Sequence, residues 1–396
     1  MSSVHSPFVD SGREVVIVDA VRTPIGRSHP TKGAFRNTHP NDLLAACLTA
    51  LIERNTVDPA LIEDVIGGCT APFGEQSRNI ARNAWLQAGY PVEVPAITID
   101  RRCGSAQSAV AYGAALIASG THELVIASGV EHMQHVPIDS PVKVMELYGT
   151  PWPQELLDRF EFVPQGLSAE LIAERWDVAR AEMDELAVIS NGRAATATAE
   201  GRFDREIVPI ATPHGTVTAD QGIRPETNLE TLATLKTPFK VDGTITAATS
   251  SQLSDGAAAV LLASRAAVEK LGVRARARII DQVTVGVDPI IMLTGPIPAT
   301  RKLLDRSGMT ISDFDLVEIN EAFASVVLAW QRELGADMDR VNVNGGAMAL
   351  GHPVGATGAR LFATILSELE RSDQELGLIT MCCGGGLGTG AVIERL

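Results

Sequence analysis

Short apolar runs alternate with amphipathic stretches along the first third of the chain. Residues 15–18, 96–99 and 124–127 are apolar runs of the kind found in buried strands of a parallel sheet. Between them, residues 41–54 and 105–119 place apolar or small residues at helical spacing. This alternation predicts an α/β fold with a mainly parallel sheet and helices on its faces.

The middle of the chain breaks this rhythm. It is rich in proline and in polar stretches, although residues 169–176 and 180–200 have a helical pattern and residues 214–237 are typical of an extended polar excursion. Such irregular segments often contact ligands. The alternation then resumes, with strands expected at 257–262, 316–319 and 376–381 and helices at 265–271, 322–334 and 359–370.

The two ends of the chain share a weak internal repeat. Cys103 and Gly355 each stand near the start of a helix of small residues, and a strand follows each helix at the same spacing. Duplication of one fold produces such a repeat, and would place Cys103 and His352 at equivalent helix starts facing one cleft. We predict an N-terminal half over residues 1–130 completed by 253–274, an inserted loop subdomain over 131–252, and a C-terminal half over 275–396.

Composition and charge restrict the classes of partner. The chain has 396 residues, 45% hydrophobic and 20% charged, which is ordinary for a globular protein of two or three domains. The net charge of −15 argues against nucleic-acid binding, because that binding needs a basic surface. No apolar run reaches the length of a membrane span. We expect neither a nucleic-acid partner nor a membrane partner.

The cysteines indicate a reducing compartment. Five cysteines at uneven spacing are too few for a disulfide framework in a chain of this size. The first 13 residues are polar and lack the apolar core of a signal peptide. We therefore predict a cytoplasmic protein.

Cys103 is a candidate nucleophile because it lies between a predicted strand and a predicted helix. A helix N-terminus carries about half a positive charge, which lowers a thiol pKa and favours the nucleophilic thiolate. Gly104 leaves room for a substrate, and Arg101 and Arg102 add positive potential. A buried, inert thiol is the alternative interpretation and the commoner fate of a free cysteine.

His352 and Asn320 are candidates for proton transfer and for hydrogen bonding to a substrate. His352 lies in a glycine-rich loop and precedes Pro353, and imidazole is the natural base for a thiol near neutral pH. The alternative is a histidine that caps a turn. Asn320 ends a predicted strand and can hold a water or a donor over a reacting carbonyl, although asparagine is also a common helix N-cap.

Cys382 and Cys383 end an apolar strand and precede three glycines. The N–H groups of such glycines, beginning with Gly384, can point at a developing oxyanion, while one cysteine moves a proton to a carbanion. A vicinal redox pair and metal ligation with His352 are the alternatives. Further ligands at zinc spacing are lacking, so we predict no metal site. A strand rather than a helix follows residues 384–388, which excludes a dinucleotide fingerprint.

Together these segments resemble the thiolase family over nearly the whole chain, and residues 21–26 and 33–35 match the opening of that family. The resemblance implies a thiolase-like, duplicated α/β/α/β/α layered fold with an inserted loop subdomain. It also implies an acyltransferase that uses CoA to cleave a 3-ketoacyl-CoA into acetyl-CoA and a shortened acyl-CoA. This reaction is a reversed Claisen condensation, with a role in fatty-acid or other lipid degradation.

The resemblance assigns a role to each candidate residue. The position matching Cys103 carries the acyl group, and those matching His352 and Cys382 are the general bases. Asn320, through a water, and the N–H of Gly384 match the oxyanion-hole groups of the family.

CoA contacts and assembly follow from the same resemblance. Ser251 matches the serine that hydrogen-bonds the pantetheine arm, and Arg224 matches a loop arginine near the nucleotide, where a guanidinium suits phosphate. The family implies CoA as co-substrate, no permanently bound cofactor, and a homodimer or homotetramer.

Three positions depart from the family pattern. Ser254 stands where the usual asparagine precedes Asp-Gly. Gln165 stands where many thiolases have methionine, and Gln252 stands where they have glycine. These departures favour a longer or bulkier acyl group over acetoacetyl-CoA. The alternatives are a biosynthetic acetoacetyl-CoA thiolase, a decarboxylating ketosynthase of related fold, a non-enzymatic acyl-CoA- or lipid-binding protein, and a cysteine hydrolase.

Overall fold

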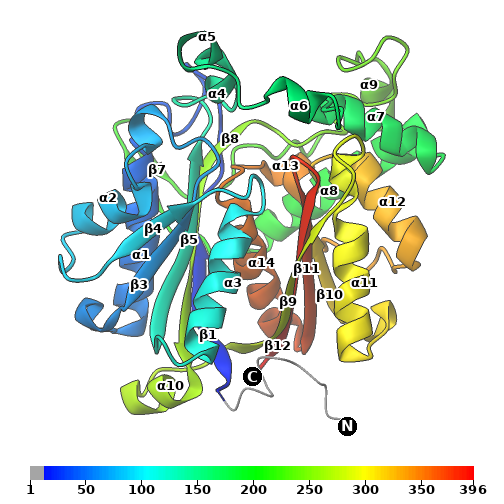
Figure 1. The fold of residues 1–396 in the computed structure, drawn as a ribbon. Coiled ribbons are helices and arrows are strands. Elements are labelled where there is room, and N and C mark those ends of the chain that lie inside the picture. Colours follow the sequence, from blue (N-terminus) through cyan, green and yellow to red (C-terminus); the bar gives the residue numbers. More distant parts are fainter. Residues whose placement is uncertain (1–12) are drawn as a thin grey trace.

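The computed structural model describes residues 13–396. Residues 1–12 of the polar N-terminal segment lie outside the described residues. The chain forms five layers, in which helices alternate with the two halves of one continuous sheet (Figure 1). The layered α/β/α/β/α fold predicted from the sequence is therefore confirmed. Its helices are α1 (Pro40–Asn55) and α2 (Ile80–Gln87) on one outer side, α3 (Ser105–Ala118) and α14 (Thr357–Ser372) in the centre, and α11 (Pro296–Ser307) and α12 (Ala324–Leu334) on the other outer side.

The N-terminal half builds its sheet in the order β1-β8-β5-β3-β4. The β1–β8 and β8–β5 pairs are antiparallel, whereas β5–β3 and β3–β4 are parallel. The strands are β1 (Val15–Arg22), β3 (Asp64–Gly68), β4 (Ala96–Ile99), β5 (Leu124–His132) and β8 (Ser254–Ser264), with the short β2 (Gly26–Arg27) beside β8.

The C-terminal half repeats this arrangement in the order β9-β12-β11-β10. The β9–β12 and β12–β11 pairs are antiparallel, and β11–β10 is parallel. Val317 of β10 also makes a parallel bridge to Val341, at the place that β4 takes in the first half. The strands are β9 (Ala277–Gly286), β10 (Leu316–Ile319), β11 (Leu376–Cys383) and β12 (Leu387–Arg395).

The matching strand order confirms the duplicated fold and corrects one prediction. The sheet is mixed rather than mainly parallel, because β8 and β12 run antiparallel to the strands on both of their sides. The two halves are also joined at the sheet level, since Val16 and Ile17 of β1 pair with Arg278 and Ala277 of β9.

The segment between β5 and β8 lies across one end of the layers (Figure 1). It contains α4 (Ser140–Lys143), α5 (Met145–Tyr148), α6 (Gln154–Leu157), α7 (Gln165–Arg175), α8 (Arg180–Ala199), β6 (Ile210–Thr212), β7 (Gly215–Val217) and α9 (Leu229–Ala233). The remaining helices are α10 (Arg265–Leu271) after β8 and α13 (Ala347–Leu350) before α14. The domain limits at residues 130, 252 and 274 stay a prediction.

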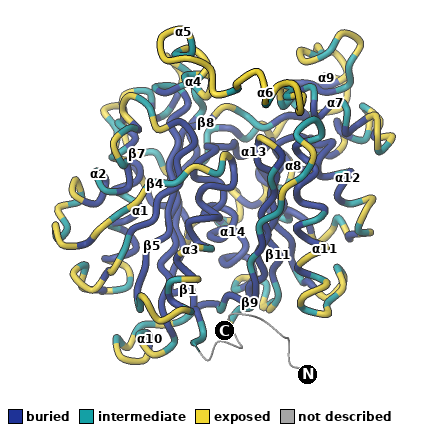
Figure 2. Tube along the Cα trace, viewed as in Figure 1, coloured by how far each residue is buried: buried dark blue, intermediate teal, exposed yellow. Residues whose placement is uncertain are grey.

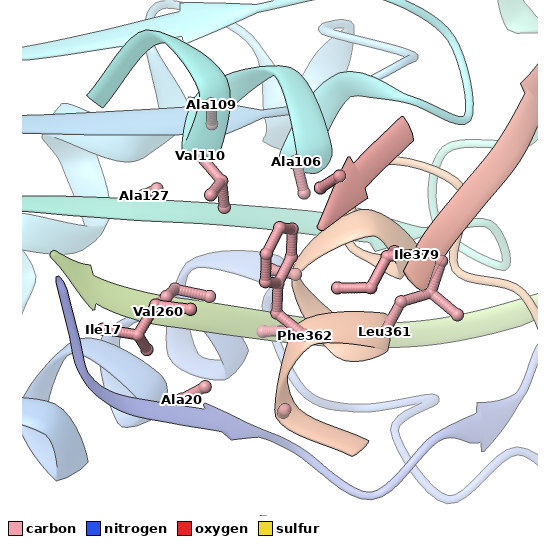
Figure 3. Close-up of a cluster of buried hydrophobic side chains, with 14 of the residues drawn as sticks. Ile17, Ala20, Ala106, Ala109, Val110, Ala127, Val260, Leu361, Phe362 and Ile379 are labelled. Carbon is pink, nitrogen blue, oxygen red and sulfur yellow. The ribbon is translucent and has the colours of Figure 1, made fainter. Parts of the chain in front are cut away.

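Of the two central helices, α14 is buried along most of its length, whereas α3 is buried on one face (Figure 2). Phe362 of α14 packs in the same cluster as Ala106 and Ala109 of α3 (Figure 3). Small residues allow the helices to approach closely, since a methyl group added to Gly358 would lie 2.2 Å from the backbone nitrogen of Gln107. The starts of the two helices, and the loops that precede them, are therefore held together.

Every helix and strand predicted above is present, with ends displaced by a few residues at most sites. The sequence analysis did not predict four of the longer elements, namely β3, α2, β9 and α11, nor the short elements β2, α4, α5, α6, β6, β7, α9 and α13. α11 begins at Pro296, and prolines are tolerated in a first helical turn because its N–H groups have no helical partner. Among residues 13–396 no helix is long and apolar enough to cross a membrane.

Candidate active site

The candidate residues lie at the ends of elements that the fold places side by side. Asn320 directly follows β10, and Cys382 lies near the end of β11, the parallel neighbour of β10. Cys103 and His352 lie in the loops that precede α3 and α14. Because these helices are in close contact, the two loops meet, which is the arrangement expected of a duplicated fold.

Cys103 is a buried thiol with a backbone donor on its sulfur. Its exposed fraction is 3%, and the N–H of Gly384 donates a hydrogen bond to Sγ. Burial raises the pKa of Cys103 to about 11, although the Gly384 N–H and the charge of Arg102 act in the opposite direction. The expected net lowering of this pKa was wrong, because the thiolate loses more solvation than the surrounding dipoles and charges return.

The ring of His352 has a defined tautomer. The Thr357 hydroxyl donates to the carbonyl of Pro353 at 2.9 Å, so it can only accept from Nδ1 of His352, 2.6 Å away. The proton is therefore assigned to Nδ1, and Nε2 carries the lone pair that can take a proton. The backbone N–H of His352 donates to Oγ of Ser254 at 3.1 Å, which anchors the loop.

The ring of His352 is neutral in the free protein. Burial lowers the pKa of His352 to about 3, and the positive charge of Arg360 adds to this effect. A neutral imidazole and a protonated Cys103 thiol therefore coexist near neutral pH. Proton transfer from sulfur to Nε2 requires the stabilisation that a bound substrate brings.

Asn320 faces His352 and does not cap a helix. Its Nδ2 lies 3.3 Å from Nε2 of His352, and α12 begins only at Ala324 with Phe323 as its N-cap residue. The N-cap alternative was therefore wrong. Within the described chain, Oδ1 of Asn320 is buried without a hydrogen-bond partner, so this atom can accept a bond from a water or a ligand.

Cys382 and Cys383 are both buried at the end of β11. Burial raises the pKa of Cys382 well above the usual thiol value, and the negative charge of a Cys103 thiolate would raise it further. Cys383 packs against Gly104, since a methyl group on Gly104 would lie 2.5 Å from its sulfur. Both thiols are therefore close to Cys103 and protonated near neutral pH.

The residues predicted to bind CoA lie beside the His352 loop. The N–H of Ser251 donates to the carbonyl of Ala322, and the guanidinium of the exposed Arg224 lies 3.4 Å from Oε1 of Gln252. Nε2 of Gln252 donates to the carbonyls of Gly222 and Met348 at 3.0 Å each. Gln252 thus links the Arg224 loop to the turn before His352.

Three supporting residues were missed by the sequence analysis. Thr357 holds the His352 tautomer, and its signal is a hydroxyl residue at the start of the helix that follows Gly-His-Pro. Buried Glu131 accepts hydrogen bonds from the N–H groups of Thr70 and Gly355, and so joins the two halves. Glu321 accepts hydrogen bonds from three residues around α13, namely Ser190, Asn342 and Met348.

Metal chemistry has no geometric support in the described residues. Between residues 13 and 396 no three His, Cys, Asp or Glu side chains are grouped in a way that could hold an ion. All five cysteines are free thiols. The site therefore consists of thiols, one imidazole, one carboxamide and backbone N–H groups.

Two family models cover nearly the whole chain. The thiolase N-terminal domain matches residues 15–266, and the thiolase C-terminal domain matches residues 273–395. The chain belongs to the thiolase family. The resemblance drawn from the sequence is thereby confirmed, and the junction between the two models lies between β8 and β9 of this thiolase.

Known relatives match this thiolase from end to end. The steroid 3-ketoacyl-CoA thiolase of Mycobacterium tuberculosis is 47% identical, over 100% of this chain and 98% of the relative. The crystal structure of the Bacillus anthracis acetyl-CoA acetyltransferase has a TM-score of 0.87 and 36% identity, and covers 97% of this chain and 99% of its own. The crystal structure of human mitochondrial 3-ketoacyl-CoA thiolase in complex with CoA has a TM-score of 0.89 and 34% identity, and covers 97% of this chain and 98% of its own.

We expect the Thr357→Val substitution to slow turnover about tenfold, because the Nδ1–H of His352 would lose its acceptor and the ring its orientation. Thr357→Ser keeps the hydroxyl and is the matched control, with turnover near that of the unmodified thiolase. Steady-state rates and their pH profile measure both variants. Unchanged turnover in Thr357→Val would show that the hydroxyl does not position the base.

We expect alkylation of Cys103 by iodoacetamide to accelerate about tenfold per pH unit from pH 7 to pH 10, because only the thiolate reacts and its pKa is raised. Mass spectrometry of the labelled peptide gives the rate, and Cys103→Ala identifies signal from other thiols. A rate that levels off near pH 7 would contradict the protonated ground state.

Proposed function

We propose that this thiolase cleaves a 3-ketoacyl-CoA with CoA, releasing acetyl-CoA and an acyl-CoA shortened by two carbons, in fatty-acid or other lipid degradation. The observation that carries the proposal is the pairing of the Cys103 sulfur with the Gly384 N–H, with a second thiol, Cys382, close by. The family membership makes the chain an acyltransferase. The name of the Mycobacterium tuberculosis relative supports a 3-ketoacyl-CoA substrate.

In the first half-reaction the Cys103 thiol gives its proton to Nε2 of His352. Its sulfur then attacks the C3 carbonyl of the substrate, and the C2–C3 bond breaks to leave an acyl-Cys103 thioester. The electron pair of that bond leaves with C2 as the acetyl-CoA carbanion, and Cys382 supplies the proton that this carbanion takes. The high pKa of Cys382 suits a thiol that is a proton donor here and a base in the reverse direction.

In the second half-reaction CoA loses its thiol proton to the Cys382 thiolate and attacks the acyl-Cys103 thioester. The Gly384 N–H and the N–H of Cys103 are the donors for the thioester oxyanion. Asn320, through a water on its carboxamide, and His352 would stabilise the oxygen of acetyl-CoA. The Cys103 thiolate leaves and recovers its proton from His352, which restores the starting state.

Arg224 and Ser251 are our candidates for CoA recognition. Arg224 is an exposed residue, but partial burial of its guanidinium lowers its pKa, and the positive charge of Arg27 adds to this effect. A phosphate group would relieve the repulsion between the two charges. The human relative solved with CoA supports CoA as co-substrate, and no permanently bound cofactor is part of the proposal.

A biosynthetic acetoacetyl-CoA thiolase is the second candidate. The Bacillus anthracis acetyl-CoA acetyltransferase shares this fold at a TM-score of 0.87, so the fold alone does not separate the two substrate classes. Gln165, which lies beside Gly384, replaces the methionine of many thiolases at the acyl end of this site. We take this departure to favour an acyl group larger than that of acetoacetyl-CoA.

The test supplies acetoacetyl-CoA and 3-ketooctanoyl-CoA, each with and without CoA, and identifies the products by mass spectrometry. We expect acetyl-CoA and hexanoyl-CoA from the longer substrate, in the presence of CoA only. Without CoA, a single turnover should leave an acylated Cys103 peptide. Release of free acid would indicate a hydrolase, and intact bound substrate would indicate a binding protein.

Cys382→Ala separates a thiolase from a ketosynthase that uses one cysteine. We expect turnover to fall by at least about a hundredfold, because proton transfer to carbon is then left to water. Cys383→Ala is the matched control and should keep most of the activity. Full activity in Cys382→Ala would contradict the proposed role.

We also propose a homodimer, with a homotetramer as its doubled form. Strand β4 ends the sheet, and in the described chain it pairs with β3 alone, while Ile97 on it is 49% exposed. An edge strand of this kind can pair with a second copy. Light scattering of the unmodified chain should give at least twice the monomer mass. Ile97→Lys should reduce this mass, whereas Leu61→Lys, a control at another exposed apolar residue, should leave it unchanged. A monomeric mass for the unmodified chain would refute this proposal.

The cytoplasm is our proposed location. The five free thiols, among them the three clustered at Cys103, would be protected from oxidation there. Fractionation of the native cell tests this placement, and recovery outside the cytosol would refute it.

A further inference from the structure

Two polar side chains, Gln165 and Arg102, lie beside Gly384. A methyl group added to Gly384 would lie 2.7 Å from Nε2 of Gln165 and 3.8 Å from Cγ of Arg102. The N–H of Gly384 is hydrogen-bonded to the sulfur of Cys103. Gln165 and Arg102 therefore border the space beside the sulfur on which the acyl group is carried.

The carboxamide of Gln165 is available to a ligand. Gln165 is the first residue of α7, it is half-buried, and Pro164 is the N-cap residue of that helix. Throughout residues 13–396, no side-chain hydrogen bond of Gln165 is formed with another residue. A half-buried amide without a partner has lost part of its solvation, so a ligand that accepts from its N–H group recovers free energy.

Arg102 supplies a positive charge at the same place. Its Cγ lies beside Gly384, and its charge acts to lower the pKa of Cys103 against the larger effect of burial. Its carbonyl accepts hydrogen bonds from the hydroxyls of Thr70 and Ser105, and these bonds fix the backbone from which the side chain extends. The φ angle of Arg102 is 52°, in the left-handed region, so these bonds hold a conformation that an arginine seldom adopts.

The carboxylates nearby leave this charge largely free. Asp100 lies 3.9 Å from the Arg102 guanidinium, and both side chains are about half exposed, so the pair is weak. Glu131 is the other negative group that acts on Cys103, but its oxygens accept hydrogen bonds from Gln76 and from backbone N–H groups.

We propose that Arg102 and Gln165 bind a carboxylate on the acyl group, so that this thiolase prefers a 3-ketoacyl-CoA of a short dicarboxylic acid. A guanidinium together with an amide N–H is a donor set that suits the two oxygens of a carboxylate. The inference rests on the proposed thiolysis and specifies its substrate. With a six-carbon substrate, 3-ketoadipyl-CoA and CoA would give succinyl-CoA and acetyl-CoA, with a succinyl group carried on Cys103.

The test compares three probes of equal acyl-chain length, namely 3-ketohexanoyl-CoA, 3-ketoadipyl-CoA and the methyl ester of 3-ketoadipyl-CoA. We expect kcat/KM for the acid to exceed that for the other two about tenfold, which is the effect of one charge-assisted hydrogen bond. Equal values, a preference for the hydrocarbon chain, or an ester as good as the acid would overturn the inference.

Substitutions of Arg102 and Gln165 test whether these two side chains cause the preference for the acid. Arg102→Met and Gln165→Met should each lower the ratio of kcat/KM for the acid to that for 3-ketohexanoyl-CoA, with a loss of about tenfold for Arg102→Met. A general effect on Cys103 cancels in this ratio, because both substrates use the same nucleophile. Arg159→Met, which removes an exposed arginine paired with Glu155, is the control and should leave the ratio unchanged. An unchanged ratio in Arg102→Met would also overturn the inference.

The outcomes separate this inference from the function on which it rests. If the unmodified thiolase cleaves all three probes at similar rates, the proposed thiolysis stands and the carboxylate site is refuted. If it cleaves none of them, and also neither acetoacetyl-CoA nor 3-ketooctanoyl-CoA, both proposals are refuted.

Discussion

The close contact between α3 and α14 is the constraint on which the rest of the structure depends. A methyl group on Gly358 of α14 would lie 2.2 Å from the backbone of Gln107 in α3. The loop before α14 is held as closely to β5, since a methyl group on Gly129 would lie 2.1 Å from the carbonyl oxygen of Gly355. Overpacking of such a contact typically costs about 1–3 kcal/mol. Because the chain has only hydrogen atoms at these points, the loop with Cys103 and the loop with His352 can meet.

Buried carboxylates hold these loops in place. Glu131 comes from the N-terminal half, yet it accepts a hydrogen bond from the N–H of Gly355, three residues after His352. Glu321 does the same for the turn before His352, through Ser190 and the N–H of Met348. A buried donor that loses its acceptor costs about 1–3 kcal/mol, so each carboxylate is a structural condition for the geometry of the site.

The geometry has a clear electrostatic consequence. Burial keeps the Cys103 and Cys382 thiols protonated and His352 neutral, so the resting site carries no charge on its reacting groups. The Gly384 N–H is already directed at the sulfur. Because this donor is in place before the reaction, it can stabilise negative charge that develops on the substrate without reorganisation. A carboxylate-bearing acyl group would add one more fixed contact, at Arg102 and Gln165, to the same donor.

The sequence by itself determined the family, the layered duplicated fold, most helices and strands, and the candidate residues at Cys103, His352, Asn320 and Cys382. These rest on local patterns, namely apolar periodicity and short motifs. Only the tertiary structure decided the direction of β8 and β12, the tautomer of His352 and the raised pKa of Cys103. The physical reason is that strand pairing, hydrogen-bond partners and desolvation come from residues far apart in the sequence, such as Gly384 beside Cys103.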